Sequence, residues 1–439
     1  MIHYIPPEDQ LSAQKFARLF CSMDRLNITF RRDLNIGLMH PPTFDASVHY
    51  NKGTGVAWGG SNSDSKRNAA FGAMGEAIER YGLFMASYDL EPASFLELQT
   101  RKLNALDPES FTLYAQDQET LIKKEVDNLR RDTVLPWTWF QDALRNDRRI
   151  LVPSLFNQFI YGHKPIYCEA STNGNGCGQS PAHAKRAAVL ELLERDAIMF
   201  YWWTKNSPLT VDLSQPCPRL RKILAPFADL LPRTTLLYTK TDFDLPTLVA
   251  VFQGDLRRRL PMMAMSGGSG LDPFRAIDRA LSELRAVVQH QMMTIPNQKS
   301  IFFSEDYDLT VWDYQDHVAL YAYQEMKPAY EFLLAGEVIH YSELPHNATG
   351  THEGDLEFIV SEFHRNNHRL YFGDLTPRHM RAVDLHIYRS FSPDLIEVDP
   401  GHKFRALGVP RFYQLPQKLA LRMRPQTSHD LNPFPHPFP

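Results

Sequence analysis

Residues 171–204 have the sequence STNGNGCGQSPAHAKRAAVLELLERDAIMFYWWT, a glycine-rich segment followed by a helical pattern. Ser180 and Pro181 mark the start of a helix, because serine is a favoured N-cap residue and proline fits the first helical position. The pattern continues through Trp203. This stretch therefore predicts a glycine-rich turn that leads directly into a long helix.

Two other segments repeat this arrangement of a glycine-rich stretch and an amphipathic helix. One predicted helix runs from about Lys66 to Met85, and another starts at Asp272 and Pro273 by the same cap logic. Apolar residues follow the 3.6-residue helical period in both segments. The predicted buried stripes are Ala70, Ala73, Met74, Ala77, Ile78, Tyr81 and Phe84 in the first helix, and Ile277, Ala280, Leu281, Leu284, Val287 and Val288 in the third.

The segments that surround these helices complete the prediction of the fold class. Glycine-rich segments precede the three helices at 53–60, 173–178 and 266–270, and β-rich runs occupy 235–238 and 247–253. Because helices alternate with strands along the chain, we expect an α/β or α+β domain. Gly72 and Gly75 lie inside the first helix, where glycine is unfavourable, so a neighbouring helix or a ligand is expected to approach there.

The motif ExxER occurs in two of the predicted helices, as Glu76, Glu79 and Arg80 and as Glu191, Glu194 and Arg195. Positions i, i+3 and i+4 share one helix face, so each motif presents two carboxylates and a guanidinium together. Carboxylate oxygens suit Mg²⁺, and the guanidinium fork suits phosphate. A glutamate and arginine face is also typical of a solvated salt-bridge surface, so the residues alone leave both interpretations open.

The last seven residues, 433–439, have the sequence PFPHPFP. In an extended segment, a period of two would place the four prolines on one side and Phe434, His436 and Phe438 on the other. Such a tail is stiff and loses little entropy on docking, and its end carries a free carboxylate that could accept a proton. A disordered terminus is the alternative, because most chain ends are poorly ordered.

Composition excludes several classes of protein. The chain has 439 residues, a net charge of −4 and no long basic run, which argues against nucleic acid as a partner. Its four cysteines form no CxxC pair, which excludes a disulfide scaffold and a zinc ribbon. The N-terminus lacks a signal-peptide pattern and no apolar run is long enough to span a bilayer. We therefore expect a cytoplasmic protein that does not bind membranes.

Three segments together resemble the core motifs of the YcaO superfamily: GAMGEAIERY (72–81), STNGNGCG with AVLELLERDAIMFYWW (171–203), and AIDRALSEL (276–284). The resemblance extends over roughly residues 50–400. It implies an α/β (α+β) ATP-binding fold particular to that family, with mixed sheets and long packed helices. It also implies that ATP and Mg²⁺ serve to activate backbone amides of peptides.

The resemblance assigns roles to particular residues of this chain. It implies Mg²⁺ binding by Glu76, Glu79, Glu191 and Glu194, and phosphate contacts by Arg80 and Arg195. It further implies that Arg279, Glu283 and Gln179 complete the nucleotide site. Three positions depart from the family pattern: Gly72 and Ala276 stand where serine is usual, and Val287 stands where glutamine is common.

The proline-rich terminus resembles that of the azoline-forming branch, the cyclodehydratases (D proteins) of thiazole/oxazole-modified microcins. In that branch the tail reaches the active site, so the carboxylate of Pro439 would be the catalytic base. We accordingly expect an N-terminal segment, 1–50, that packs on the core, a catalytic domain over 51–424, and a tail over 425–439 that reaches the active site.

The function implied by this resemblance is an ATP-dependent cyclodehydratase that converts Cys, Ser or Thr of a ribosomal precursor peptide to thiazoline or oxazoline. The implied partners are that peptide, an E1-like protein that binds its leader, and a flavin-dependent azoline dehydrogenase. Two alternatives remain. The same ATP site could form thioamides or amidines, and the three departures from the family pattern would also suit an ATP-silent scaffold subunit of a peptide-modifying complex.

Overall fold

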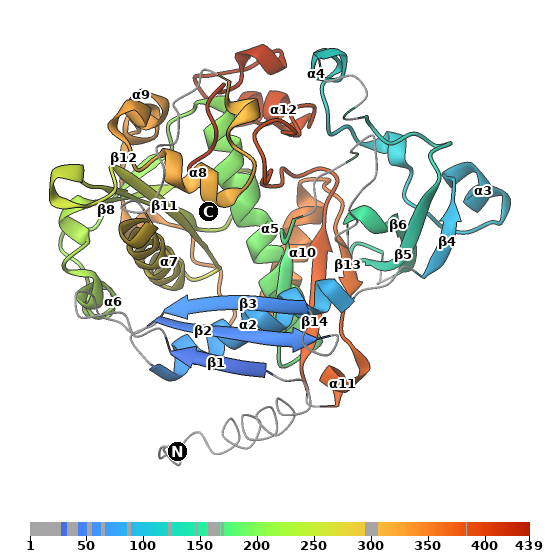
Figure 1. Cartoon of the computed structure of the whole chain (residues 1–439), viewed down its shortest axis with the longest axis horizontal. Helices are drawn as coiled ribbons and strands as arrows, with labels where there is room; N and C mark the ends of the chain where they lie inside the picture. Colours follow the sequence, from blue (N-terminus) through green and yellow to red (C-terminus); the bar gives the residue numbers. More distant parts are fainter. Residues whose placement is uncertain are drawn as a thin grey trace.

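The computed structural model describes residues 28–32, 43–50, 55–62, 66–85, 89–121, 125, 127–145, 148–156, 167, 171–294, 306–382 and 384–439, and up to residue 71 it describes the backbone only. Helix α5 (Pro181–Thr204) lies at the centre of the molecule (Figure 1). The Ser180 hydroxyl accepts a 3.1 Å hydrogen bond from the His183 amide, and Lys205 ends the helix in a left-handed conformation at φ 54°. The predicted helix is thus confirmed at both ends.

An antiparallel sheet of β1 (Ile28–Arg32), β2 (Thr43–Tyr50) and β3 (Gly55–Asn62) packs against helix α2 (Lys66–Met85). The bounds of α2 are the predicted ones. Its stripe is buried at Ala73, Ala77, Ile78 and Tyr81, whereas the side chains of Ala70 and Met74 lie outside the described residues. Phe84 is 40% exposed, so its predicted burial is wrong. It lies in the last turn next to Met85, which is 43% exposed, whereas the preceding Leu83 is buried, so the buried face of this turn includes Leu83 and not Phe84.

The glycines of α2 also differ from expectation. Gly72 is exposed, and an added Cβ at Gly75 would meet none of the described atoms within 4 Å, so the described part of the chain makes no close approach at Gly75. The close contact lies instead at Gly82, where a Cβ would come 2.8 Å from Ile387 Cδ1. Gly82 therefore lets α2 lie against the strand that carries Ile387.

A second, mixed sheet has the strand order β11-β10-β9-β8-β12, in which β12 runs parallel to β8 and the other pairs are antiparallel. Helix α7 (Pro273–Thr294) packs on β11 and β10, and every residue of its predicted stripe is buried. The strands are β8 (Leu209–Asp212), β9 (Thr234–Tyr238), β10 (Thr247–Gln253), β11 (Met263–Ser269) and β12 (Val338–His340).

A third sheet has the order β4-β5-β13-β14-β7, with β6 paired to β5. Strand β7 lies within the glycine-rich segment 173–178 and packs on α5, because Gly176 and Gly178 allow the backbones to meet: a Cβ on either would come within 2.6 Å of a backbone atom of α5. The strands are β4 (Leu90–Ala93), β5 (Leu135–Asp142), β6 (Arg148–Pro153), β7 (Asn175–Gly178), β13 (Tyr371–Asp374) and β14 (His386–Phe391).

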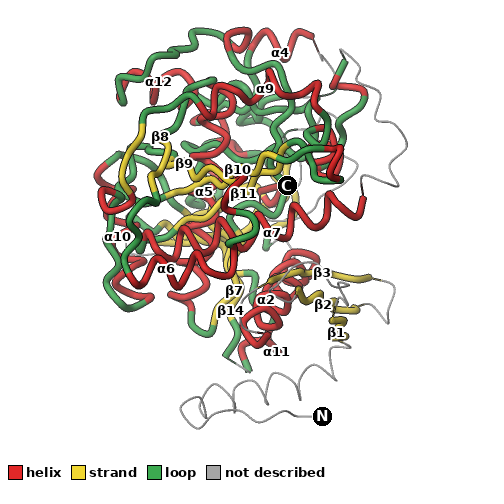
Figure 2. Tube along the Cα trace, turned by 90° about the vertical axis from the view of Figure 1, so that its left-hand side faces the viewer, coloured by secondary structure: helices red, strands yellow, loops and turns green. Residues whose placement is uncertain are grey.

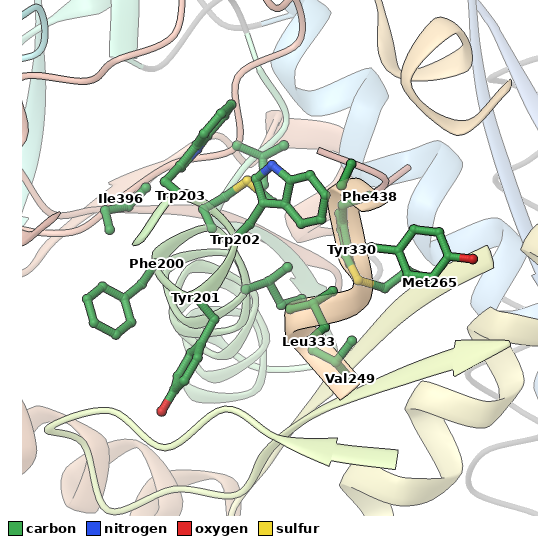
Figure 3. Close-up of a cluster of buried hydrophobic side chains, with 14 of the residues drawn as sticks. Phe200, Tyr201, Trp202, Trp203, Val249, Met265, Tyr330, Leu333, Ile396 and Phe438 are labelled. Carbon is green, nitrogen blue, oxygen red and sulfur yellow. The ribbon is translucent and has the colours of Figure 1, made fainter. Parts of the chain in front are cut away.

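The C-terminal half of α5 is buried on all sides in a large apolar cluster that includes Trp202, Trp203, Met265 and Phe438 (Figure 3). Figures 1 and 2 both place the chain end close to β11 and α7, inside the molecule. Three sheets with long packed helices confirm the predicted α+β class. The remaining helices are α3 (Phe95–Thr100), α4 (Gln116–Leu121), α6 (Pro218–Leu224), α8 (Tyr314–Leu320), α9 (Lys327–Tyr330), α10 (His352–Arg365), α11 (Arg378–Arg381) and α12 (Arg411–Lys418).

None of the helices in the described part of the chain combines the length and the apolar character that a membrane span requires.

Candidate active site

Helices α2, α5 and α7 bring five glutamates into one electrostatic cluster, which we call the glutamate cluster: Glu76, Glu79, Glu191, Glu194 and Glu283. Burial raises the pKa of Glu79 well above its usual value, and the charges of Glu191 and Glu76 add to the shift. Burial likewise raises the pKa of Glu191 and of Glu283 to about 7. Arg195 opposes both shifts, while Glu194 adds to both. Like charges on three helices are therefore held close together at low exposure.

The arginines of the two ExxER motifs contact the glutamates of their own helices. Arg80 Nη2 lies 2.5 Å from Glu76 Oε1. Arg195 Nη1 donates a 2.9 Å hydrogen bond to Glu194 Oε1, and Arg195 Nη2 lies 3.6 Å from Glu191 Oε1. Without a ligand, these guanidinium groups therefore neutralise part of the negative charge that the cluster concentrates.

Strand β11 closes one side of the cluster through a glycine. A Cβ added at Gly267 would lie 2.8 Å from Glu194 Oε1 and 2.8 Å from Ile198 Cδ1, which is too short for an unstrained contact. The glycine-rich segment at 266–270 is therefore the feature of the sequence that corresponds to this close approach of strand β11 to α5. The sequence could not say which side chain of α5 the strand meets.

Arg279 and Gln179 lie in a second group at the N-terminal end of α5. The backbone N–H of Gln179 donates a 3.3 Å hydrogen bond to His183 Nδ1, while Gln179 is exposed. Arg279 donates to the Ser269 carbonyl at 3.1 Å and helps lower the pKa of His183 to about 4, mainly a burial effect. His183 and Glu191 are eight residues apart on α5, about 12 Å along the helix, since each residue rises about 1.5 Å.

The donor set of the glutamate cluster suits a divalent cation. Among the described residues, no three His, Cys, Asp or Glu side chains already converge as a ligand cage. Mg²⁺ does not need such a cage, because it usually takes one or two protein carboxylates and completes its shell with water and phosphate oxygens. A cation would also relieve the repulsion that raises the pKa values of Glu79, Glu191 and Glu283. The cluster therefore fits Mg²⁺ bound together with a phosphate ligand.

Sequence reasoning missed the roles of two residues next to the cluster, Arg389 and Asn175. The charge of Arg389, on β14, influences Glu191, and Arg389 pairs in register with Asn175 on β7. Both amide atoms of Asn175 are buried without a partner among the described residues. Cys177 lies near Glu79, and burial raises the pKa of its thiol to about 12, so it is not a reactive thiolate. No motif in the sequence marked Arg389, and Asn175 lies within the STNGNGCG segment without a role of its own.

Two of the departures from the family pattern lie in the core and not in the glutamate cluster. Ala276 and Val287 are buried in the apolar cluster between α7 and its sheet. The close approach here involves the Ala276 backbone: its carbonyl oxygen would lie 2.3 Å from a Cβ on Gly268, so position 268 has no room for a side chain. Gly72, the third departure, is exposed on α2.

The C-terminal tail contacts the same arginine as the glutamates. Phe438 is fully buried, and the Arg195 guanidinium carbon lies 4.3 Å from the centre of its ring. Pro433 is exposed, whereas Pro435, His436 and Pro437 are buried, so from Pro435 onward both sides of the tail are covered. Figure 3 shows Phe438 beside the Trp202 end of α5.

Comparisons with known proteins agree with this geometry. Residues 61–396 match the family model described as YcaO cyclodehydratase, ATP- and Mg²⁺-binding. A solved heterocyclase in complex with substrate and cofactor shares the fold over 95% of this chain, with a TM-score of 0.72 and 17% identity. This chain spans 57% of the length of that heterocyclase.

Two further solved structures share the fold. The Methanopyrus kandleri YcaO protein bound with AMPPCP and Mg²⁺ has a TM-score of 0.64 and 15% identity, over 92% of this chain and 94% of its own. The E. coli microcin synthetase McbBCD complex with pro-MccB17 bound has a chain with a TM-score of 0.56 and 12% identity, over 84% and 88%. At such low identities, the likeness concerns the fold.

Proposed function

Because this chain belongs to the YcaO family, we propose that it is an ATP- and Mg²⁺-dependent cyclodehydratase that forms azolines in a ribosomally made peptide. The observation that carries the proposal is the meeting of the glutamate cluster with the chain end: Arg195 contacts Glu191, Glu194 and Phe438. The nucleotide and the peptide would thus react at the five carboxylates and two guanidinium groups of this region, and we propose that the terminal carboxylate of Pro439 reaches the same place.

The proposed site uses the predicted residues in the predicted roles. Glu76, Glu79, Glu191 and Glu194 would hold Mg²⁺, which would neutralise negative charge on the phosphates of ATP. Arg80 and Arg195 would exchange their glutamate contacts for phosphate oxygens. Glu283, Arg279 and Gln179 would complete the nucleotide site. Along α5, His183 and Glu191 are about 12 Å apart at about 1.5 Å per residue, and the bound nucleotide would span this separation.

The proposed reaction balances without an added oxidant or reductant. The thiol or hydroxyl of a Cys, Ser or Thr side chain bonds to the preceding amide carbon and gives its proton to the Pro439 carboxylate. The carbonyl electron pair becomes an oxyanion, which takes the γ-phosphoryl group of ATP and releases ADP. Loss of phosphate and of the amide proton then forms the C=N bond of the azoline.

The partners are also part of the proposal. In the McbBCD complex, the similar chain works within an assembly that binds a peptide, pro-MccB17. We accordingly expect this chain to act in the cytoplasm on a thiazole/oxazole microcin-type precursor, with an E1-like leader-binding protein and a flavin-dependent dehydrogenase.

The decisive experiment is mass spectrometry of a Cys/Ser-rich precursor, encoded near this gene, after incubation with the chain, its E1-like neighbour and Mg-ATP. Each ring should remove about 18 Da, and only when ATP and an intact tail are present. A variant that lacks Pro435–Pro439 is the matched control. A gain of about 16 Da would instead show thioamide formation, and no mass change without ATP consumption would indicate the scaffold alternative.

A further inference from the structure

The tail is anchored through its carbonyl groups. Prolines at 433, 435, 437 and 439 have no N–H, so the tail cannot pair with a neighbouring strand in the usual way. The core supplies side-chain donors instead: Trp202 Nε1 donates to the Phe434 carbonyl at 3.1 Å, the Tyr321 hydroxyl donates to the Pro435 carbonyl, and His317 Nδ1 lies 2.8 Å from the His436 carbonyl. Trp202 belongs to α5, His317 belongs to α8, and Tyr321 is the residue that caps the end of α8.

His436 and His317 form a reciprocal pair at the last of these anchors. Their rings stack 3.8 Å apart at an interplanar angle of 7°, and both side chains are fully buried. His436 Nε2 lies 3.0 Å from the Asp399 carbonyl. Since carbonyl oxygens only accept, Nε2 of His436 and Nδ1 of His317 each carry a proton. The two imidazoles therefore hold the tail by a stacked ring contact and by two hydrogen bonds of fixed direction.

We propose that His317 and His436 act as a positioning pair, in which two stacked neutral imidazoles fix how far the chain end reaches toward Arg195. His436 lies two residues before Phe438, whose ring contacts the Arg195 guanidinium, and three residues before the terminal carboxylate. Because the intervening residues include Pro437, a shift at His436 would be passed on to Pro439. This inference rests on the proposed function, in which the Pro439 carboxylate takes the proton of the attacking side chain.

The surroundings of the pair favour neutral rings. Besides burial, Arg195 on α5 contributes to the lowered pKa of His436, and Arg405, on the loop after Asp399, contributes to that of His317. The other titratable groups described around the pair are His402, Tyr307, Tyr321 and the carboxylates of Asp308 and Asp399. Burial lowers the pKa of His436 to about 4 and lowers that of His317 well below its usual value. A proton added to His317 would sit on Nε2, which is buried without a partner in the described part of the chain. The pair should therefore stay neutral throughout the working pH range.

The first test observes the pair directly in the wild-type chain, by NMR with ¹⁵N-labelled histidine. We expect His436 with its proton on Nε2 and His317 with its proton on Nδ1, and neither should titrate between about pH 5.5 and 8. The variant His436→Gln assigns the signal of His436. A midpoint near 6.5 for either ring, or the opposite tautomers, would overturn the inference. This measurement needs no substrate, so its outcome is independent of whether the chain forms azolines.

The second test separates positioning from general support of the fold. His317→Asn keeps a donor at the place of Nδ1, whereas His317→Leu removes it. We expect His317→Leu to lower kcat about 10- to 100-fold, the cost of a misplaced catalytic group, with KM for ATP changed less than about 2-fold, and His317→Asn to recover most of the loss. Calorimetry with a nonhydrolysable ATP analogue should show equal affinity in both variants.

A third variant separates a loss of positioning from a loss of stability. His436→Phe preserves the aromatic stack and the volume but cannot donate to Asp399, so it should fold and still lose kcat. Wild-type kcat in His317→Leu and His436→Phe would overturn the positioning role, as would a parallel loss of affinity for the ATP analogue. If the wild-type chain forms no azoline at all, the proposed function fails, while the NMR result still decides the geometry of the pair.

Discussion

The guanidinium carbon of Arg195 lies 4.3 Å from the centre of the Phe438 ring, although 243 residues separate the two in the chain. Arg195 also pairs with Glu191 and Glu194, so a single side chain connects the C-terminal tail to the glutamate cluster. A buried cation against a ring is stabilised by about 2 kcal/mol when both are desolvated. This contact is therefore a measurable link between the tail and the proposed chemistry.

Replacing the aromatic ring tests that link. Phe438→Leu keeps an apolar side chain of similar reach but removes the π face, so we expect kcat to fall about 5- to 30-fold, which corresponds to about 1–2 kcal/mol. Azoline formation by mass spectrometry measures the effect. Phe434→Leu, on the partly buried part of the same tail, should change kcat less than about 2-fold. Equal losses in the two variants would contradict a specific role of the Arg195 contact.

Removal of one glutamate tests the metal assignment. Glu194→Gln preserves shape, but one carboxylate charge disappears from the cluster, so we expect a folded chain whose kcat falls at least about 100-fold. Circular dichroism confirms the fold, and calorimetry should show weaker binding of the Mg-ATP analogue. The control is Glu357→Gln on the exposed side of α10, which should behave as wild type. Near-normal turnover by Glu194→Gln would remove Glu194 from the metal site.

Metal binding should depend on pH. The pKa values of Glu191 and Glu283 are raised to about 7, first by burial, so at pH 7 each still holds about half a proton. Mg²⁺ requires the ionised form, so binding of Mg²⁺ with an ATP analogue should release protons and strengthen from pH 6 to 8. Calorimetry in two buffers of different ionisation enthalpy counts these protons. Zero release at pH 7 would show that neither carboxyl meets the cation.

The raised pKa values of Glu191 and Glu283 also make the stability of the fold depend on pH. The direction of this dependence is opposite to that produced by an ordinary salt-bridged carboxylate. A folded-state pKa above the unfolded value means that the native chain binds more protons than the unfolded chain between about pH 4.5 and 7. The free energy of unfolding of the unliganded chain should therefore fall as the pH rises through this window, with Glu191 and Glu283 contributing. Mg²⁺ with an ATP analogue should reverse the trend. Chemical denaturation at several pH values measures it.

The substitutions Gly267→Ala and Gly75→Ala form a matched pair. Gly267→Ala would force Glu194 Oε1 and Ile198 Cδ1 away from a Cβ at 2.8 Å, so we expect kcat to fall about 10-fold or more as Glu194 moves. Gly75→Ala adds its methyl group where nothing lies within 4 Å, inside a helix, and should stabilise the fold by about 0.5–1 kcal/mol. A Gly267→Ala enzyme with full activity would show that strand β11 does not set the position of Glu194.

Arg411, which pairs with Asp196 of α5, should make a large contribution to the free energy of unfolding. It is 4% exposed, and its guanidinium donates to Asp196 at 2.9 Å and to Asp242 at 2.7 Å. Removing it leaves the Asp196 carboxylate without its guanidinium partner, while Asp242 keeps Lys418 at 2.9 Å, so Arg411→Ala should cost about 3–5 kcal/mol in urea denaturation. The exposed Arg422→Ala should cost less than about 0.5 kcal/mol. A loss below 1 kcal/mol for Arg411→Ala would mean that water replaces the guanidinium.

The local sequence determined the long helices and the two ExxER motifs. The cap at Ser180 and Pro181, the full extent of α2 and the apolar stripe of α7 all depend on neighbours within a few residues, which is why periodicity and cap residues predicted them. The two ExxER motifs were visible for the same reason, since residues three and four apart share a helix face. The exposure of Phe84 was not predictable in this way, because it depends on where the neighbouring core ends.

Tertiary structure alone decided which of these local features meet. Glu283 joins the glutamates of α2 and α5 because α7 packs on β11, and Gly267 of that strand lies against Glu194. Arg389 and His317 carry no sequence motif, and the motifs that contain Asn175 and His436 did not reveal their partners, because each contact joins segments more than 100 residues apart. The periodicity of a sequence specifies which face of a helix or strand a residue occupies. Burial shifts a pKa, and packing aligns two rings, only once distant segments have come together in the folded chain.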